Sequence, residues 1–141
     1  MKIFLDTNVI LDYFQNREGV GAVLDILDLV NVRKDCRIYV SYLSIADSAY
    51  ILRKTHDNEK LKHTFKEFLQ LCDVLPMNDM QIYEAVRSGT SPDFEDNLQI
   101  ICAEYGGCDL IISHNLSHFR GHTDIPVLSP QEFVSHCCVE S

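Results

Sequence analysis

The 141-residue chain is 46% hydrophobic and 23% charged, which is typical of a soluble globular protein, and we expect one domain over residues 1–141. No run of about twenty apolar residues occurs, and the N-terminus reaches Asp6 too early for a signal peptide, so a cytoplasmic protein without a membrane span is expected. Twelve basic and 21 acidic residues give a net charge of -9, which argues against nucleic-acid binding through a diffuse basic surface.

The first predicted elements are a strand and a helix separated by a polar triplet. The apolar run 2–5 is too short for a buried helix and indicates a strand. Residues 9–14 continue as a helix, for which Thr7 or Asn8 is the expected N-cap. Asp6 therefore ends the strand and is expected at the mouth of a sheet.

Helices and short apolar strands alternate along the rest of the chain. The expected helices cover 20–33, 44–52 (capped by Ser41 or Ser44), 59–71, 79–87, 94–105 and a segment starting at 130–134. The expected strands cover 37–40, 74–76, 109–112 and 125–128, and 114–118 is a polar loop. This alternation predicts an α/β fold with a short, mostly parallel sheet covered on both faces, whose ligands bind at the carboxyl ends of the strands.

Four polar residues fall where these elements start or stop, or inside an apolar helix. Asp6 ends the first strand, Asn115 follows the penultimate strand, and Asp96 lies in the first turn of the helix before it. Asp47 is embedded in the apolar helix 44–52, where a carboxylate is costly to bury unless it is paired or bound to a cation. Asp93 and Glu95 are explained by helix capping and solvation.

Other reactive residues have simpler explanations. The six cysteines lack C-x-x-C spacing, so reduced and buried side chains are expected, with Cys137 and Cys138 the most exposed. His114, His118 and His122 have the four-residue spacing of a zinc site, but their polar context with Gly121 favours a loop at the surface or near phosphate. The basic residues Arg53, Lys54, His56, Lys60, Lys62, His63 and Lys66 form either a solvated helix face or a patch that follows a nucleic-acid backbone.

Five segments in order resemble the PIN domain family, and in particular the single-domain bacterial proteins of the VapC toxin type. They are Asp6-Thr7-Asn8-Val9-Ile10-Leu11-Asp12, the helix 44–52 with Asp47, residues 93–99, residues 109–115 and residues 125–130. Any one segment is weakly specific, whereas all five in order cover essentially the whole chain.

This resemblance implies a Rossmann-like three-layer α/β/α sandwich and a Mg²⁺- or Mn²⁺-dependent endoribonuclease. It further implies an RNA substrate, a cognate antitoxin protein of a type II toxin–antitoxin pair, and a homodimer. Asp6, Asp47, Asp96 and Asn115 match the four acidic positions that hold metal and catalyse hydrolysis. Thr7, Asn8 and Ser113 match small polar positions beside the metals, and Asp93 and His118 are expected to support the site or contact substrate.

The chemistry of these side chains agrees with that assignment. Mg²⁺ prefers hard oxygen ligands, so three carboxylates and a carboxamide suit it better than cysteine or histidine. An acidic site also attracts phosphate once divalent cations fill it, so the net charge does not exclude a nuclease. Without metal, like charges at this site are expected to raise some carboxyl pKa values.

Three positions depart from the family pattern. Asp47 stands where most members have Glu, Asn115 where many have Asp, and His118 where Asp commonly precedes phenylalanine. A shorter ligand and a lost charge are expected to weaken a second metal more than the first. The alternative function is therefore a catalytically weakened PIN-like module that binds RNA or protein. A nucleotide-binding or phosphatase domain is disfavoured because the chain lacks a G-x-G-x-x-G or Walker-type loop.

Overall fold

The structure, a computed structural model, describes residues 1–140, and side chains up to residue 136. The strands are β1 (Lys2–Leu5), β2 (Arg37–Ser41), β3 (Asp73–Leu75), β4 (Leu110–Ile112) and β5 (Val127–Leu128). The helices are α1 (Thr7–Gln15), α2 (Val20–Val32), α3 (Tyr42–Leu52), α4 (Asn58–Phe68), α5 (Asp79–Ser88), α6 (Phe94–Tyr105), α7 (Leu116–Phe119) and α8 (Pro130–Glu140). The predicted alternation of strands and helices is confirmed.

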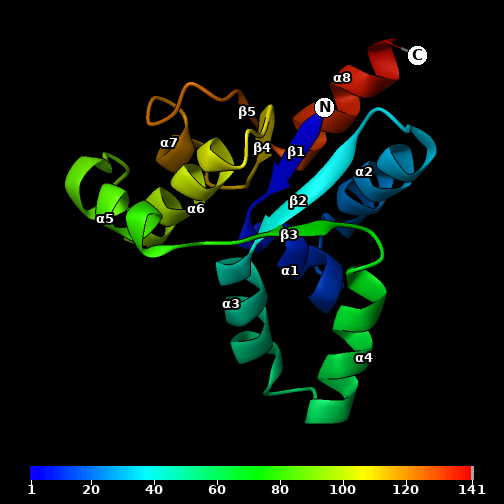
Figure 1. Ribbon diagram of the computed structural model, residues 1–141. Coiled ribbons are helices and arrows are strands. Elements are labelled where there is room, and N and C mark those ends of the chain that lie inside the picture. The colour runs from blue at the N-terminus through cyan, green and yellow to red at the C-terminus, as the bar shows by residue number, and fades with distance from the viewer. Residues whose placement is uncertain (141) are drawn as a thin grey trace.

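The strands form one sheet in the order β3-β2-β1-β4-β5, and every pairing is parallel (Figure 1). β1 lies in the centre, with Ile3 opposite Ile38 of β2 on one side and Leu110 of β4 on the other. Its residues after Lys2 are fully buried, as the continuous apolar run requires. Parallel pairing brings the carboxyl ends of β1, β2 and β4 to the same edge.

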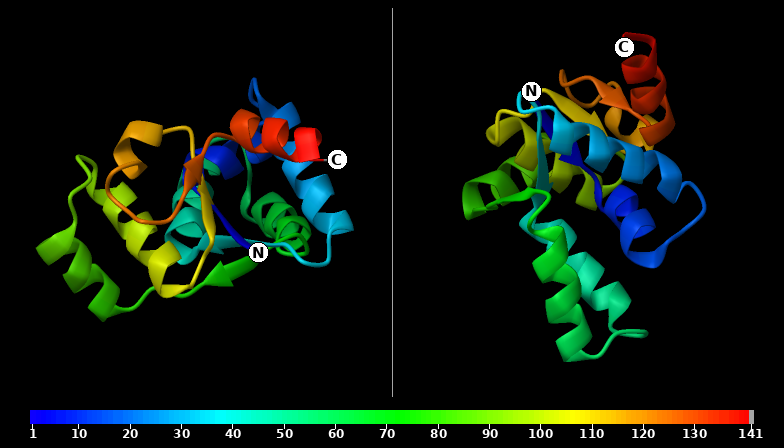
Figure 2. Two further views of the ribbon diagram at one scale, coloured as in Figure 1. Left: turned by 90° about the horizontal axis from the view of Figure 1, so that it is seen from above. Right: turned by 90° about the vertical axis from the view of Figure 1, so that its right-hand side faces the viewer.

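Helices cover both faces of the sheet, which confirms the α/β/α sandwich (Figures 1 and 2). Alternate strand side chains point to opposite faces. Ile3 and Leu5 belong to the apolar cluster that includes residues of α1, α2, α4 and α8. Phe4 and Ile111 belong to a second cluster with residues of α6 and α7. The core is therefore divided between the two faces of the sheet.

Helices α3 and α4 extend beyond the carboxyl edge of the sheet, where α3 continues directly from β2 (Figure 1). The amphipathic spacing of α4 turns Phe65 and Phe68 inward, and both rings pack against Phe14 of α1 with centroids 5.4 and 4.8 Å apart. These contacts anchor the C-terminal end of α4 to the core.

Several predicted boundaries were wrong. Asp6, not Thr7 or Asn8, is the N-cap of α1, because its carboxylate accepts a hydrogen bond from the Thr7 backbone N–H. The predicted helix 59–71 ends at Phe68, and Leu69 and Leu71 are exposed. β5 begins at Val127 rather than residue 125. The short helix α7 (Leu116–Phe119) replaces the second half of the predicted loop 114–118.

The cysteine expectation is confirmed where the structure can test it. Cys36, Cys72, Cys102 and Cys108 are buried and free. Burial raises the pKa of the Cys72 and Cys102 thiols to about 12, so neither is a reactive thiolate. The side chains of Cys137 and Cys138 lie outside the described part. None of the described helices is both long and apolar enough to cross a membrane.

Candidate active site

A cavity of about 420 Å³ opens at the carboxyl edge of the sheet, between the start of α1, the side of α3 and the start of α6. Its lining residues are Asp6, Thr7, Asn8, Leu11, Leu43, Asp47, Tyr50, Ile51, Asp93, Glu95, Asp96, Gln99 and Asn115. The structure therefore brings together the four residues that the sequence analysis named as metal ligands, although more than a hundred residues separate the first from the last.

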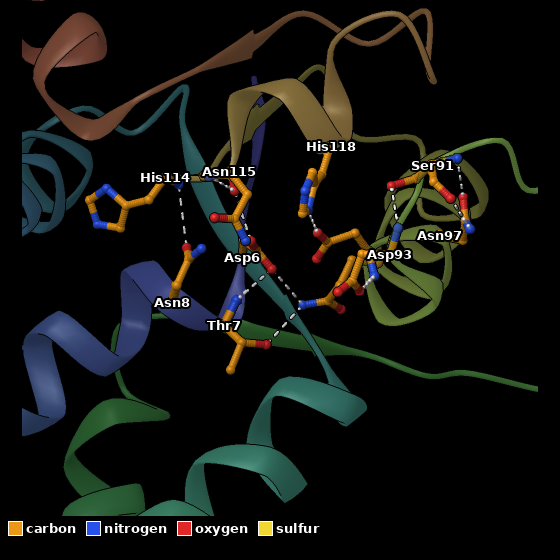
Figure 3. A network of polar contacts seen from close by, with 12 residues as sticks. Asp6, Thr7, Asn8, Ser91, Asp93, Asn97, His114, Asn115 and His118 are labelled. Carbon is orange, nitrogen blue, oxygen red and sulfur yellow. Dashed lines mark hydrogen bonds and ion pairs between the residues drawn. The ribbon is translucent and has the colours of Figure 1, made fainter.

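Asp6 forms the floor of this cavity and is only 3% exposed. Its Oδ1 accepts hydrogen bonds from the Thr7 N–H at 2.8 Å and from Gln99 Nε2 at 3.2 Å. Its Oδ2 accepts one from Ser113 Oγ at 2.8 Å, and the contact between Asp6 and Thr7 is drawn in Figure 3. Burial raises the pKa of Asp6, and these three hydrogen bonds lower it only in part. The carboxylate is thus held rigidly by neutral donors.

Gln99 connects the floor to the wall and was missed by the sequence analysis. It is 2% exposed, and its Nε2 lies 3.0 Å from Thr7 Oγ1 and 2.7 Å from Ser44 Oγ. Its Oε1 accepts a hydrogen bond from Ser41 Oγ at 2.5 Å. One signal could have found it, since Gln99 follows Asp96 by three residues and so shares its helix face. The carboxamide joins α6 to the starts of α1 and α3.

Asp96, in the first turn of α6, approaches Asp6 from the other side of the cavity. It is 7% exposed, and burial, followed by the negative charge of Asp6, raises its pKa to about 6. Its Oδ2 lies 2.9 Å from Nδ1 of His118. Asp93, the N-cap of α6, accepts a hydrogen bond from the Asp96 N–H at 2.9 Å. One ligand atom from each of Asp93, Asp96 and His118 lies within 4.8 Å of the others.

Asp47 and Glu95 bring two further carboxylates to the cavity. Asp47 lies on α3 and lines the cavity. Its side chain is half-buried, and this burial raises its pKa. Glu95 is largely exposed. Its pKa is raised by the partial loss of solvent around the carboxyl group and then by the negative charges of Asp47, Asp93 and Asp6. The expected repulsion between carboxylates is therefore present. Glu95, which the sequence analysis assigned to the solvent, lines the cavity.

Asn115 and its neighbours close the remaining side. Asn115 is exposed, and its backbone N–H donates to Ser113 Oγ at 3.0 Å, so Ser113 links this loop to Asp6. Asn8 Oδ1 accepts a weak hydrogen bond from the His114 N–H at 3.4 Å. The His114 Nε2 lies 2.5 Å from the Oδ2 of buried Asp12, which fixes the loop to α1.

The three histidines do not form a common site. His114 contacts Asp12, His118 contacts Asp96, and the Nδ1 of His122 lies 2.8 Å from Thr90 Oγ1. Each of these side chains therefore has a different partner.

The donor set of the cavity fits a divalent cation. Five of its lining residues are Asp or Glu, whereas no Lys or Arg is among them in the part of the chain that the structure describes. Buried carboxylates without a cationic partner are unfavourable. Hard oxygen donors of this kind are the ligands that Mg²⁺ and Mn²⁺ prefer. The cavity is thus arranged to bind positive charge.

The amino-acid sequence is similar to a known protein family and to a known ribonuclease. A family model described as PIN domain matches residues 2–117. Ribonuclease VapC1 of Aquifex aeolicus is 30% identical over 138 residues, which cover 94% of this chain and 92% of that protein.

Solved structures share the fold. VapBC-1 from nontypeable Haemophilus influenzae matches with a TM-score of 0.71 and 17% identity, over 93% of this chain and 99% of that one. FitAcB from Neisseria gonorrhoeae matches with a TM-score of 0.68 and 20% identity, over 92% and 98%. VapBC2 from Rickettsia felis, bound to a DNA fragment from its promoter, matches with a TM-score of 0.68 and 15% identity, over 92% and 98%.

Proposed function

Because the chain belongs to the PIN domain family, we propose that it is a VapC-type endoribonuclease that hydrolyses RNA phosphodiester bonds with Mg²⁺ or Mn²⁺. The observation that carries this proposal is the cavity with five carboxylates and no Lys or Arg among its described lining. The name of the Aquifex aeolicus relative supplies the substrate class.

We assign Asp6, Asp96, Asp47 and Asn115 to the metal-binding site, with Asp6 and Asp96 as the principal ligands. A divalent cation held by these residues would neutralise charge on the phosphoryl oxygens and activate water. Asp6 is oriented by its three hydrogen bonds, and His118 orients Asp96. Since the pKa of Asp96 is raised to about 6, cation binding below that pH must displace a proton from its carboxyl group.

The flanking polar residues have supporting roles. Ser113 and Gln99 hold the Asp6 carboxylate, and Thr7 contributes its backbone N–H. Asn8 and Asp93 line the cavity, where Asp93 also caps α6. Asn115 is neutral and exposed, so it adds less to cation binding than the carboxylates do.

The direct test is RNA cleavage by the purified protein in Mn²⁺. Asp6→Asn keeps the shape of the side chain but removes its charge, and we expect it to lower the cleavage rate by at least about 100-fold, more than the loss of a supporting residue. Asp28→Asn, at an exposed position of α2, is the matched control and should cleave normally. Equal cleavage by wild type and Asp6→Asn would mean that the activity belongs to a contaminant.

We further propose that the protein is the toxin of a type II toxin–antitoxin pair, acting in the cytoplasm as a homodimer that a cognate antitoxin inhibits. The antitoxin partner is supported by the structural neighbours, since one of them is a toxin–antitoxin complex from Klebsiella pneumoniae. Induced expression should arrest growth, and co-expression of the adjacent open reading frame should relieve the arrest. Unchanged growth would contradict the toxin assignment.

A further inference from the structure

One wall of the acidic cavity is apolar and aromatic. It is formed by the face of α3 that carries Leu43, Asp47, Tyr50 and Ile51, which recur at helical spacing. Asp47 and Tyr50 are three residues apart, so the phenol ring lies one helical turn from a carboxylate that we assign to the metal. The cavity thus joins an acidic floor to an aromatic side.

The ring of Tyr50 is held in place and remains accessible. The guanidinium carbon of Arg53 lies 3.7 Å from the ring centroid, and Arg53 Nη1 donates a hydrogen bond to the Tyr50 carbonyl at 2.6 Å. Arg53 therefore covers one face of the ring. Tyr50 is nevertheless 65% exposed, which leaves the opposite face available for a ligand.

A flat, exposed aromatic ring stacked on a cation matches a nucleobase better than other parts of RNA. Every base has a π-face, so stacking is tolerant of sequence, and aromatic side chains beside arginine serve this purpose in proteins that bind single strands. Arg53, which lies over the Tyr50 ring, also adds positive charge beside a cavity whose described lining contains no Lys or Arg. That charge would attract the phosphate next to the base.

We propose that Tyr50, supported by Arg53, stacks against an unpaired nucleobase next to the phosphodiester bond that the cavity cleaves. This inference rests on the proposed ribonuclease function. It assigns α3 two roles, since Asp47 contributes to the metal site while Tyr50 positions the RNA. It also requires an unpaired nucleotide at the cleavage site, because a base inside a helix has no free face to offer.

The test compares two tyrosines of the same helix. Tyr42 is also 65% exposed in α3 but does not line the cavity, so Tyr42→Ala is the matched control for Tyr50→Ala. We expect Tyr50→Ala to weaken binding of a short single-stranded RNA by roughly 5- to 150-fold, the range for loss of one base stack. Tyr50→Phe should restore binding, because it keeps the ring. Arg53→Gln should weaken binding by roughly 2- to 5-fold.

Binding should be measured with Ca²⁺, under conditions where wild type does not turn over. Short RNAs carry a fluorescent adenine analogue at successive positions, and stacking on Tyr50 should quench its emission at one of them. Removing the base at that position should abolish the difference between wild type and Tyr50→Ala. In Mn²⁺, Tyr50→Ala should raise KM more than it lowers kcat.

The outcomes separate the two proposals. If wild type cleaves RNA while Tyr50→Ala binds and cleaves as well as Tyr42→Ala does, the stacking role is wrong, and Tyr50 is more simply a contact for a partner protein. Quenching that depends on Tyr50, without any cleavage by wild type, would contradict the nuclease function but establish the stacking contact. An abasic RNA that still distinguishes Tyr50→Ala from wild type would also overturn the proposal.

Discussion

The two ends of the sheet carry cavities of similar size and opposite character. The cavity at the carboxyl end has a volume of about 420 Å³, and the other, of about 500 Å³, lies where β2 and β3 begin and is lined by Arg33, Lys34, Arg37 and Asp73, among others. In the second cavity Arg37 pairs with Asp73, and both side chains are substantially exposed. In the first, Asp6 and Asp96 are buried with raised pKa values.

The difference shows that volume does not identify a functional site. The Arg37–Asp73 pair at the amino end is solvated and already neutralised, so it costs little and requires no ligand. Charges at the carboxyl end are buried among like charges, which is tolerated only if binding compensates for it. The predictions below test this contrast.

Among the residues that support the site, the largest effect is expected at Gln99, which connects the elements at the carboxyl end of the sheet. Gln99→Met keeps the volume but removes the hydrogen bonds to Asp6, Thr7 and Ser44. We expect Mn²⁺ affinity to fall by about 10- to 100-fold and the free energy of unfolding by about 1–3 kcal/mol. Calorimetry and urea unfolding measure the two changes.

A second buried glutamine provides the control for that substitution. Gln81 of α5 is 5% exposed and does not line the acidic cavity, and its Oε1 has no hydrogen-bond partner within the described residues. Gln81→Met should therefore leave Mn²⁺ affinity unchanged and destabilise the protein less. Equal loss of metal affinity in both variants would show that Gln99 has no special role at the site.

Without metal, the protein should be more stable at mildly acidic pH than at neutral pH, because Asp96 is buried beside another carboxylate. The pKa of Asp96 is raised from 3.8 to about 6 in the folded state, so its contribution to stability is complete below 3.8 and is lost as pH rises through 6. We expect the Tm in EDTA to be higher at pH 5 than at pH 7. Asp96→Asn should flatten this dependence, and a metal-free Tm that falls from pH 7 to pH 5 would contradict it.

The smallest effect is expected at the amino end. Arg37→Met removes the exposed ion pair with Asp73 and should change the free energy of unfolding by less than about 1 kcal/mol. Mn²⁺ affinity and RNA cleavage should match those of wild type. A large loss of either would show that the second cavity takes part in function.

The sequence predicted the architecture well because its strands are short apolar runs and its helices are strongly periodic. It failed where periodicity has no meaning, since the four residues of α7 span about one turn. The helix that ends at Phe68 was extended too far because Leu69 and Leu71 are apolar, although both are exposed. Exposure of single apolar residues cannot be seen in a pattern.

The candidate site was predictable only in its acidic part. Asp6 was identified because it ends a strand at the carboxyl edge of the sheet, and Asp96 because the spacing around it resembles the PIN domain family. Gln99, Ser41 and Ser44 were missed because such residues are usually solvated or cap helices, and their joint burial depends on how α3 and α6 meet.

Titration calorimetry with Mn²⁺ tests the central claim most directly, which is that the carboxyl end of the sheet binds divalent cations through Asp6. Wild type and Asp28→Asn should bind Mn²⁺ with the same affinity at or below millimolar concentration, whereas Asp6→Asn should bind at least about 100-fold more weakly, a larger loss than that of a supporting residue. Absence of binding at millimolar Mn²⁺, or equal binding by wild type and Asp6→Asn, would contradict the account. The first result would instead favour a module that binds RNA or protein without catalysis.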